Sequence, residues 1–177
     1  FPSKPVMFWD DKDMKKYSNS YFSRYPNVWC HGDYVKLMDT DGMIFYGRSD
    51  TTLNRGGIRI GTAEIYRQVE LLDEVIESIV VEQVLIDDSR IVLFVKLAQE
   101  QLTEELKQKI INQIRSNTTP RHVPDLILQV SDIPRTKSGK IVELAVQKAI
   151  NNLPIDNKTA LENPEVLSEY YNHKELQ

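Results

Sequence analysis

The hydrophobic and polar positions of this chain change their period several times, which predicts alternating strands and helices. Two short apolar runs flank the turn-forming stretch 39–42, a composition typical of a β-hairpin. A second, shorter hairpin is predicted around the tip 55–57, which holds two glycines. A helical pattern then begins at Thr62, whose hydroxyl is suited to cap the first turn, and apolar residues recur on one face across 65–72.

The rest of the chain continues with β-rich runs, an amphipathic helix with acidic residues near its positive end, a short strand and a final helix. Counted from the second hairpin, the element order is β-β-α-β-β-α-β-α. This order predicts an α+β fold, a small mixed sheet with flanking helices, preceded by a β-hairpin segment. The expected elements are strands at 75–85, 90–98 and 126–130, with a turn at 86–89, and helices at 103–117 and 141–151, a weak helix at 10–25 and a terminal helical turn at 164–171.

Composition narrows the functional classes. A chain of 177 residues with 41% hydrophobic and 27% charged residues is able to bury a core. The net charge of −4 excludes a basic surface spread over the whole domain, so nucleic acid is not an expected partner. No apolar run reaches the roughly 18 to 20 residues that span a bilayer, so no membrane partner is expected. The single Cys30, with no Cys/His cluster for a metal, indicates a reducing cytosolic compartment.

Two basic, glycine-bearing loops, 47–50 and 134–140, are the candidate chemical features. Each places cations on a bendable backbone, which suits a polyanion such as a nucleotide phosphate. A P-loop is excluded because Pro134 stands where that motif needs glycine and Ile141 where it needs serine or threonine. The glycines at 56, 57 and 61 also fail the dinucleotide-binding spacing. The simplest alternative for either loop alone is a solvated turn with a local ion pair.

Taken together, the segments 46–50, 53–70 and 134–140 resemble the motifs of the adenylate-forming acyl-CoA synthetases, and the likeness covers nearly the whole chain. The start at Phe1 without methionine further suggests a piece of a longer protein. The resemblance implies that residues 1–49 finish a large nucleotide-binding domain whose main part precedes the chain. Residues 50–177 would then form a mobile C-terminal lid domain.

By this resemblance, three residues act on the nucleotide and the activated acid. Lys140 would be the catalytic lysine that bridges the substrate carboxylate and the nucleotide. Arg48 would contact the ribose or phosphate of the nucleotide, because a guanidinium binds phosphate in a bidentate manner. Asp33, in a Gly-Asp pair, would accept hydrogen bonds from the ribose hydroxyls.

The resemblance also implies a hinge and a coenzyme A face. Asp50 would be the hinge, a short stretch that absorbs dihedral change when the lid turns. Gly57 would leave room for the pantetheine arm, because only a residue without Cβ lets the backbone approach a narrow tunnel. Arg59 would lie near the CoA entrance. None of the site residues is expected to bind a metal.

The implied reaction is a two-step ligation. ATP and the acid would give an acyl-adenylate and pyrophosphate, with Mg²⁺ neutralising the phosphates, and coenzyme A would then displace AMP. Within the family, the segment 53–70 is most similar to members that activate acetoacetate. Acetate or propionate stays open because the acyl pocket would lie in the absent large domain. A different class is a non-catalytic binding or regulatory module, and the isolated chain is expected to be inactive.

Overall fold

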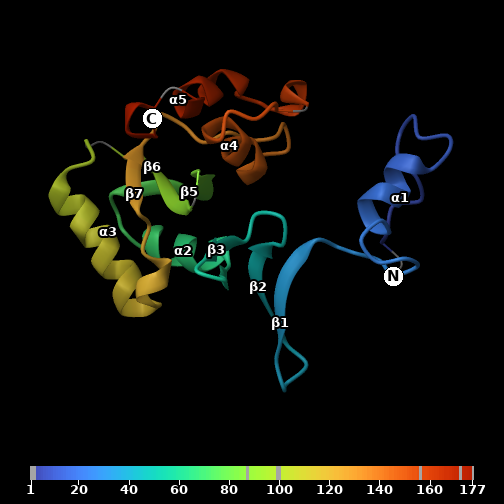
Figure 1. Cartoon of the computed structure of the whole chain (residues 1–177), viewed down its shortest axis with the longest axis horizontal. Helices are drawn as coiled ribbons and strands as arrows, with labels where there is room; N and C mark the ends of the chain where they lie inside the picture. The colour runs from blue at the N-terminus through green and yellow to red at the C-terminus, as the bar shows by residue number, and fades with distance from the viewer. Residues whose placement is uncertain (1–2, 87, 99–100, 156, 172, 177) are drawn as a thin grey trace. The chain divides into compact units, whose positions relative to one another are not determined.

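The computed structural model describes residues 3–86, 88–98, 101–155, 157–171 and 173–176, and divides the chain into two compact units, Phe1–Asp33 and Tyr34–Gln177 (Figure 1). The first unit is built around helix α1 (Lys15–Tyr21) and an aromatic cluster. Tyr21 stacks on Trp29 with 3.8 Å between ring centroids. The Asp11 carboxylate accepts hydrogen bonds from the backbone N–H groups of residues 16 and 17, which holds the start of the helix.

The second unit contains the remaining elements, with β1 beginning at the unit boundary. In chain order they are β1 (Asp33–Leu37), β2 (Met43–Arg48), β3 (Leu53–Arg55), β4 (Ile58–Ile60), α2 (Thr62–Val69), β5 (Val75–Val84), β6 (Ser89–Leu97), α3 (Glu104–Asn117), η1 (Pro120–His122), β7 (Leu126–Gln129), α4 (Glu143–Ile150), η2 (Lys158–Ala160), η3 (Pro164–Val166), α5 (Leu167–Tyr171) and η4 (Lys174–Leu176).

A three-stranded mixed sheet in the order β5-β6-β7 forms the centre of this unit. The β5–β6 pair is antiparallel, with Val80 opposite Leu93, and the β6–β7 pair is parallel, with Phe94 opposite Leu128. The predicted α+β class with a small mixed sheet is therefore confirmed. The hairpins β1–β2 and β3–β4 are separate two-stranded sheets, as the turn compositions predict.

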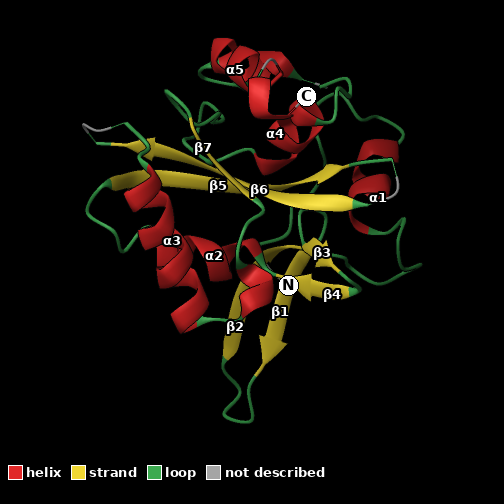
Figure 2. Cartoon of the chain, turned by 60° about the vertical axis from the view of Figure 1, so that its left-hand side comes forward, coloured by secondary structure: helices red, strands yellow, loops and turns green. Residues whose placement is uncertain are grey.

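Both faces of the central sheet are buried. Figure 2 shows α4 and α5 over one face and α2 and α3 over the other. Successive residues of β5 alternate between the two sides: Ile79 and Val81 belong to the cluster under α4 and α5, and Val80 belongs to the cluster under α2 and α3. This two-sided burial explains why the centres of the two strands, 79–81 in β5 and 91–95 in β6, are continuous apolar runs rather than alternating ones.

Local signals placed most element ends to within one or two residues, but α1 spans only Lys15–Tyr21 of the expected helix at 10–25. Thr103 caps α3 by accepting a hydrogen bond from the Leu106 N–H at 3.2 Å. The expectation that Thr62 caps α2 is wrong, because Gly61 is the N-cap and Thr62 is the first helical residue. The last predicted helix begins at Glu143 rather than residue 141. In the predicted turn 86–89, Asp87 lies outside the described residues.

The contact boundary after Asp33 falls earlier in the chain than the domain boundary expected after residue 49. The hairpin β1–β2 belongs to the same compact unit as α2, and the Arg67 guanidinium donates to the Phe45 carbonyl at 3.1 Å. A compact unit describes contacts in one conformation and does not locate a pivot. The division of the chain into 1–49 and 50–177 therefore stays a prediction.

Gly61 allows β2 to pack closely against the start of α2. A Cβ at Gly61 would lie 2.4 Å from the Tyr46 carbonyl oxygen and 2.5 Å from the Tyr46 Cβ. At Gly47, which has φ +129°, a Cβ would lie 2.7 Å from the Thr62 hydroxyl oxygen. The two glycines thus permit a contact between the strand and the helix that no larger residue would allow.

We expect Gly61→Ala to push β2 away from α2, at an overpacking cost of about 1–3 kcal/mol. The measurement is backbone hydrogen exchange of residues 43–48, which should become faster while β5 to β7 keep their protection. Gly42→Ala is the matched control, because a Cβ there meets only ordinary contacts at 3.6 Å or more. Unchanged protection of β2 in Gly61→Ala would contradict this account of the packing.

Candidate functional site

The loop that carries Lys140 is a tight turn whose two ends are joined by backbone hydrogen bonds. Arg135 and Ile141 form an antiparallel bridge across its base, and the Thr136 N–H donates to the Lys140 carbonyl at 2.8 Å. Gly139 has φ +81°, and its N–H donates to the Thr136 carbonyl at 2.8 Å. The glycine therefore supplies the left-handed conformation that turns the chain immediately before the lysine.

Two of the three cations of this loop remain available. Arg135 is engaged, because its guanidinium forms an ion pair with Glu77 of β5 and donates to the Gly139 carbonyl at 2.6 Å. Lys137 and Lys140 are exposed, and no described residue hydrogen-bonds or pairs with either ammonium. Of the three cations that the sequence places on this loop, Arg135, Lys137 and Lys140, the structure therefore leaves only the two ammonium groups for a ligand, on a loop that Arg135 stiffens.

The loop is braced from behind by the C-terminal segment. Asp132 accepts hydrogen bonds from the Lys96 ammonium at 2.7 Å and from the Asn163 amide at 2.8 Å, and the bond from Lys96 lowers the pKa of this carboxyl. The same Asn163 amide donates to the Ile133 carbonyl at 3.0 Å. The Tyr170 hydroxyl donates to the Asp132 carbonyl at 2.9 Å. These bonds fix the entry of the loop to the core.

Of the two expected nucleotide-binding residues, one lies beside the predicted hinge. Arg48 and Asp50 form an ion pair, with 3.3 Å between Nε and Oδ1, and about half of each side chain is exposed. Such exposed pairs contribute little to stability and exchange easily with other partners. Asp33 belongs to the first unit, where its carboxylate lies 3.6 Å from the His31 imidazole Nε2. The structure thus brings Arg48 and Asp50 together.

The expected CoA face is the tip of the β3–β4 hairpin. Gly56 and Gly57 have φ of +58° and +81°, and a Cβ on either would meet no atom within 4 Å. Arg55 anchors the hairpin by donating to the Val123 carbonyl at 2.5 Å and by pairing with the Asp125 carboxylate. Arg59 is exposed, and no described residue pairs with its side chain. The tip is therefore an open, cationic surface.

Sequence reasoning missed a carboxylate that joins the segment after Asp50 to the helix after Lys140. Glu143 accepts hydrogen bonds from the Thr51 hydroxyl at 2.6 Å and from the Tyr66 hydroxyl. Burial, together with the neighbouring Glu143 charge, raises the pKa of the Tyr66 phenol well above its ordinary value. No local signal pointed to this cluster, since Thr51 and Glu143 stand 92 positions apart.

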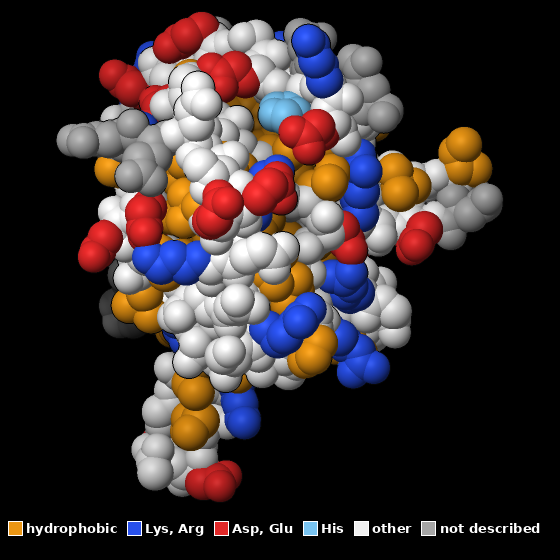
Figure 3. All heavy atoms as spheres, turned by 90° about the vertical axis from the view of Figure 1, so that its left-hand side faces the viewer, with side chains coloured by type: hydrophobic (Ala, Val, Ile, Leu, Met, Phe, Trp, Pro, Cys, Tyr) orange, Lys and Arg blue, Asp and Glu red, His pale blue; other side chains and the backbone are white. Residues whose placement is uncertain are grey.

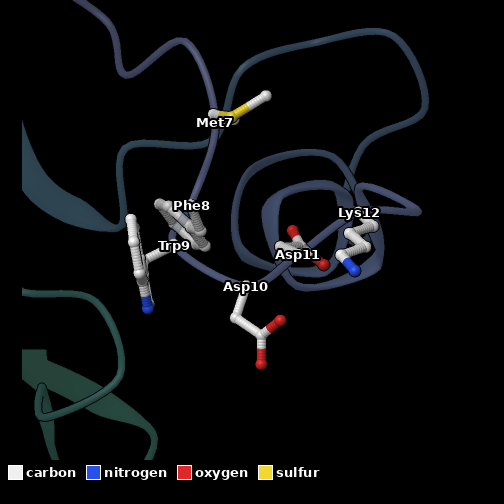
Figure 4. Close-up of a pocket in the computed structure, with 6 residues that line it drawn as sticks. All are labelled: Met7, Phe8, Trp9, Asp10, Asp11 and Lys12. Carbon is white, nitrogen blue, oxygen red and sulfur yellow. The ribbon is translucent and has the colours of Figure 1, made fainter.

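One further hollow lies within the first unit and holds none of the expected site residues. It is lined by Met7, Phe8, Trp9, Asp10, Asp11 and Lys12, and Figure 4 shows Phe8 and Trp9 side by side along it.

On the face that carries α3, acidic and basic side chains are interspersed (Figure 3). Across the described ranges, no three His, Cys, Asp or Glu side chains gather to hold a metal ion. No helix in the described part of the chain is both long enough and apolar enough to cross a membrane.

Comparisons with known proteins point to one family. Residues 68–140 match the family described as AMP-binding enzyme C-terminal domain, a match that begins in α2 and ends on Lys140. Over 99% of its length the chain is 56% identical to an acetoacetyl-coenzyme A synthetase of Rhizobium meliloti and 45% identical to an acetoacetyl-CoA synthetase of Xenopus tropicalis. The chain spans 27% of the length of each of these relatives.

Solved structures give the same picture. The acetoacetyl-CoA synthetase of Streptomyces lividans matches 97% of the chain, which covers 26% of that structure, with a TM-score of 0.88 and 40% identity. A benzoate CoA ligase of Burkholderia xenovorans matches 80% of the chain and is itself covered over 27%, with a TM-score of 0.65 and 22% identity, and so supports the fold alone.

Two tyrosines, the partly buried Tyr66 and the buried Tyr170, predict alkaline instability. Burial is the main cause that raises the pKa of Tyr66 and of Tyr170 above the ordinary 10.0, so each phenol stays protonated in the folded state. Above pH 10 the unfolded chain loses these protons first, so the free energy of unfolding should fall with rising pH. The expected slope is up to about 1.4 kcal/mol per pH unit for each tyrosine.

The measurement is urea unfolding at a series of pH values above 10, compared with Tyr170→Phe. Removing this phenol should make the decline shallower by up to the contribution of one tyrosine. Equal slopes in the two proteins would contradict the assignment of Tyr170 as a phenol that stays protonated in the fold.

Proposed function

We propose that this chain supplies the C-terminal part of an AMP-forming acid–thiol ligase, because its residues 68–140 match the AMP-binding enzyme C-terminal domain family and the whole chain is similar to acetoacetyl-CoA synthetases. The intact enzyme activates acetoacetate with ATP and transfers the acyl group to coenzyme A. The observation that carries the proposal is the placement of Lys140, an exposed and unpaired cation on a braced loop at the end of the family match.

In the first step, a carboxylate oxygen of the acid attacks the α-phosphorus of ATP, and pyrophosphate leaves. The Lys140 ammonium bridges the acid carboxylate and the nucleotide, where it offsets the negative charge that accumulates when two anions approach. The braced base of the loop keeps that ammonium in place, which limits the reorganisation that the step requires. Arg48 contacts the nucleotide once its exposed pair with Asp50 opens, and Asp33 binds the ribose.

In the second step, the thiol sulfur of coenzyme A attacks the acyl carbon, AMP leaves, and the thiol proton is released. The open tip at Gly57 lets the pantetheine arm pass close to the backbone, and Arg59 attracts the phosphates of CoA. The body after Asp50 turns between the steps, so that the tip replaces the Lys140 loop over the acyl-adenylate. The contact of β2 with α2 spans this pivot and belongs to one of the two positions.

The names of the relatives support the choice of substrate, and the cellular setting is part of the proposal. Acetoacetate is favoured over acetate or propionate because the relatives described above are named for it. We place the enzyme in the cytosol, in the lipid and ketone-body metabolism that consumes acetoacetate. Mg²⁺ accompanies ATP in this proposal, but the described residues offer no cluster of acidic or imidazole ligands that fits a metal ion. We therefore derive no step through Mg²⁺ on this chain.

The isolated chain is expected to release no pyrophosphate from ATP and acetoacetate, because it spans about a quarter of its relatives and lacks most of the nucleotide site. A pyrophosphate assay on the isolated chain and on the intact enzyme compares the two directly. Release by the isolated chain would contradict the division of labour proposed here. If the intact protein binds nucleotide but converts none of it, the result would instead favour the alternative that this chain is part of a regulatory module.

Lys140→Ala in the intact enzyme should lower the rate of adenylate formation by about 100-fold or more, as expected for losing an electrostatic contact at the reacting centre. Thioester formation from supplied acetoacetyl-adenylate should stay near the wild-type rate. Lys137→Ala is the matched control, because it removes the other unpaired cation of the same loop. An equal fall of both half-reactions in Lys140→Ala would show that the assigned role is wrong.

Gly57→Leu should leave adenylate formation intact and block the transfer to coenzyme A. The side chain fills the open space beside the hairpin tip through which the pantetheine arm would pass. Gly56→Leu serves as the control, since it introduces comparable backbone strain at the same tip. Steady-state rates with varied CoA separate the cases, and normal thioester synthesis by Gly57→Leu would remove the tunnel role.

A further inference from the structure

The carboxylate of Glu143 is held by side chains from elements far apart in the sequence. Its Oε2 accepts from the Thr51 hydroxyl at 2.6 Å, and its Oε1 accepts from the Tyr66 hydroxyl. The Tyr66 oxygen in turn accepts the Val80 N–H at 3.2 Å, so the chain of bonds ends on the central sheet. Thr51 is only 7% exposed, so water does not readily replace its bond to the carboxylate.

Each end of this network lies close in sequence to one functional position of the proposed lid. Thr51 directly follows Asp50, the proposed pivot. Glu143 comes three residues after Lys140 and is the first residue of α4. The residue before Glu143 is also bonded to the loop, because the Val142 N–H donates to the Pro134 carbonyl at 3.1 Å, which ties the start of α4 to the entry of the Lys140 loop. A displacement of Glu143 is therefore transmitted to the loop.

An acidic residue in the first turn of a helix has an ordinary explanation, a favourable interaction with the helix dipole. That explanation does not account for the partners of Glu143. The start of α4 has no side-chain cap bond, and both carboxylate oxygens are taken by hydroxyl groups of other elements. Hydrogen bonds to an ionised acceptor are stronger than neutral ones, and losing a donor leaves part of the charge unsatisfied.

We propose that Glu143 is a positioning residue that locks the segment after the pivot to the base of the Lys140 loop, so that both turn as one body. This inference rests on the proposed function, because it concerns how rotation at Asp50 delivers Lys140 to the acid and nucleotide. The lock matters for adenylate formation, which uses the Lys140 loop. It matters little for thioester formation, which uses the Gly57 tip on a separately anchored hairpin.

The test uses the intact enzyme and the pair Thr51→Val and Thr51→Ser. Valine is isosteric with threonine but cannot donate, whereas serine keeps the hydroxyl. We expect Thr51→Val to lower the maximal rate of adenylate formation by about tenfold, the effect of one hydrogen bond to a charged group. Thr51→Ser should stay within about twofold of wild type. Thioester formation from supplied acyl-adenylate should stay within about twofold in both variants.

A second variant and a second readout separate positioning from mere stability. Glu143→Gln offers only one accepting oxygen to two hydroxyl donors, so it should reproduce the selective loss of adenylate formation. Hydrogen exchange of the backbone amides at 141–146 should be faster in Thr51→Val than in Thr51→Ser, at temperatures where both proteins are fully folded. This exchange measurement does not depend on catalysis.

The outcomes are distinct. Equal rates for the valine and serine variants, or a fall of both half-reactions by the same factor in Thr51→Val, would overturn the role of Glu143 while the proposed function stands. A wild-type enzyme that releases no pyrophosphate with ATP and acetoacetate, acetate or propionate would overturn the proposed function, and the role of Glu143 with it.

Discussion

The arrangement of the second unit depends on a small sheet that is apolar on both faces. Neither face of β5, β6 and β7 tolerates water, so helices must cover both, with α2 and α3 on one side and α4 and α5 on the other. The functional loops then occupy the connections between these layers. The β3–β4 hairpin packs Leu53 and Ile60 into the cluster under α2 and α3, and the Lys140 loop joins β7 to α4 on the opposite face.

This layered arrangement holds the backbone of the Lys140 loop in place, as the proposed chemistry requires. The Lys140 loop is short and exposed, yet its entry is fixed by Asp132 and Asn163 and its interior by Arg135. In the proposed function the exposed ammonium groups of Lys137 and Lys140 act on a ligand, whereas the engaged Arg135 holds the backbone. Lys140 is exposed and Arg135 is engaged, although the two residues are only five positions apart. The engagement of Arg135 also satisfies the Gly139 carbonyl of the turn.

Local patterns were sufficient to predict the elements, because each depends on neighbours in sequence. The glycine pair 56–57 supplies the positive φ of a tight hairpin, and Thr103 caps α3 through a residue three positions away. The start of α2 at Thr62 was predicted correctly, but its N-cap was misassigned, because Gly61 gives no side-chain signal and its position depends on Glu64 and on the close approach of Tyr46. The roles assigned to the site residues came from a family resemblance rather than from pattern.

Long-range pairings could not be predicted from the sequence. Glu77 neutralises Arg135 across 58 positions, and Thr51 meets Glu143 across 92. Both pairings decide which polar groups of the site are available, and no periodicity encodes them. The resemblance pointed to Lys140, but only the three-dimensional contacts showed that Arg135 is occupied. They also showed that Glu143 accepts hydrogen bonds from Thr51 and Tyr66, the observation from which its positioning role is proposed.

The central claim is that the body after Asp50 changes position between two half-reactions. The most direct test is a pulsed electron-spin distance measurement in the intact enzyme, between labels on Cys30 and on Lys137→Cys, with other cysteines replaced. We predict two different distance distributions, one with a non-hydrolysable ATP analogue and acetoacetate, the other with AMP and coenzyme A. A single, unchanged distribution under both conditions would contradict the account.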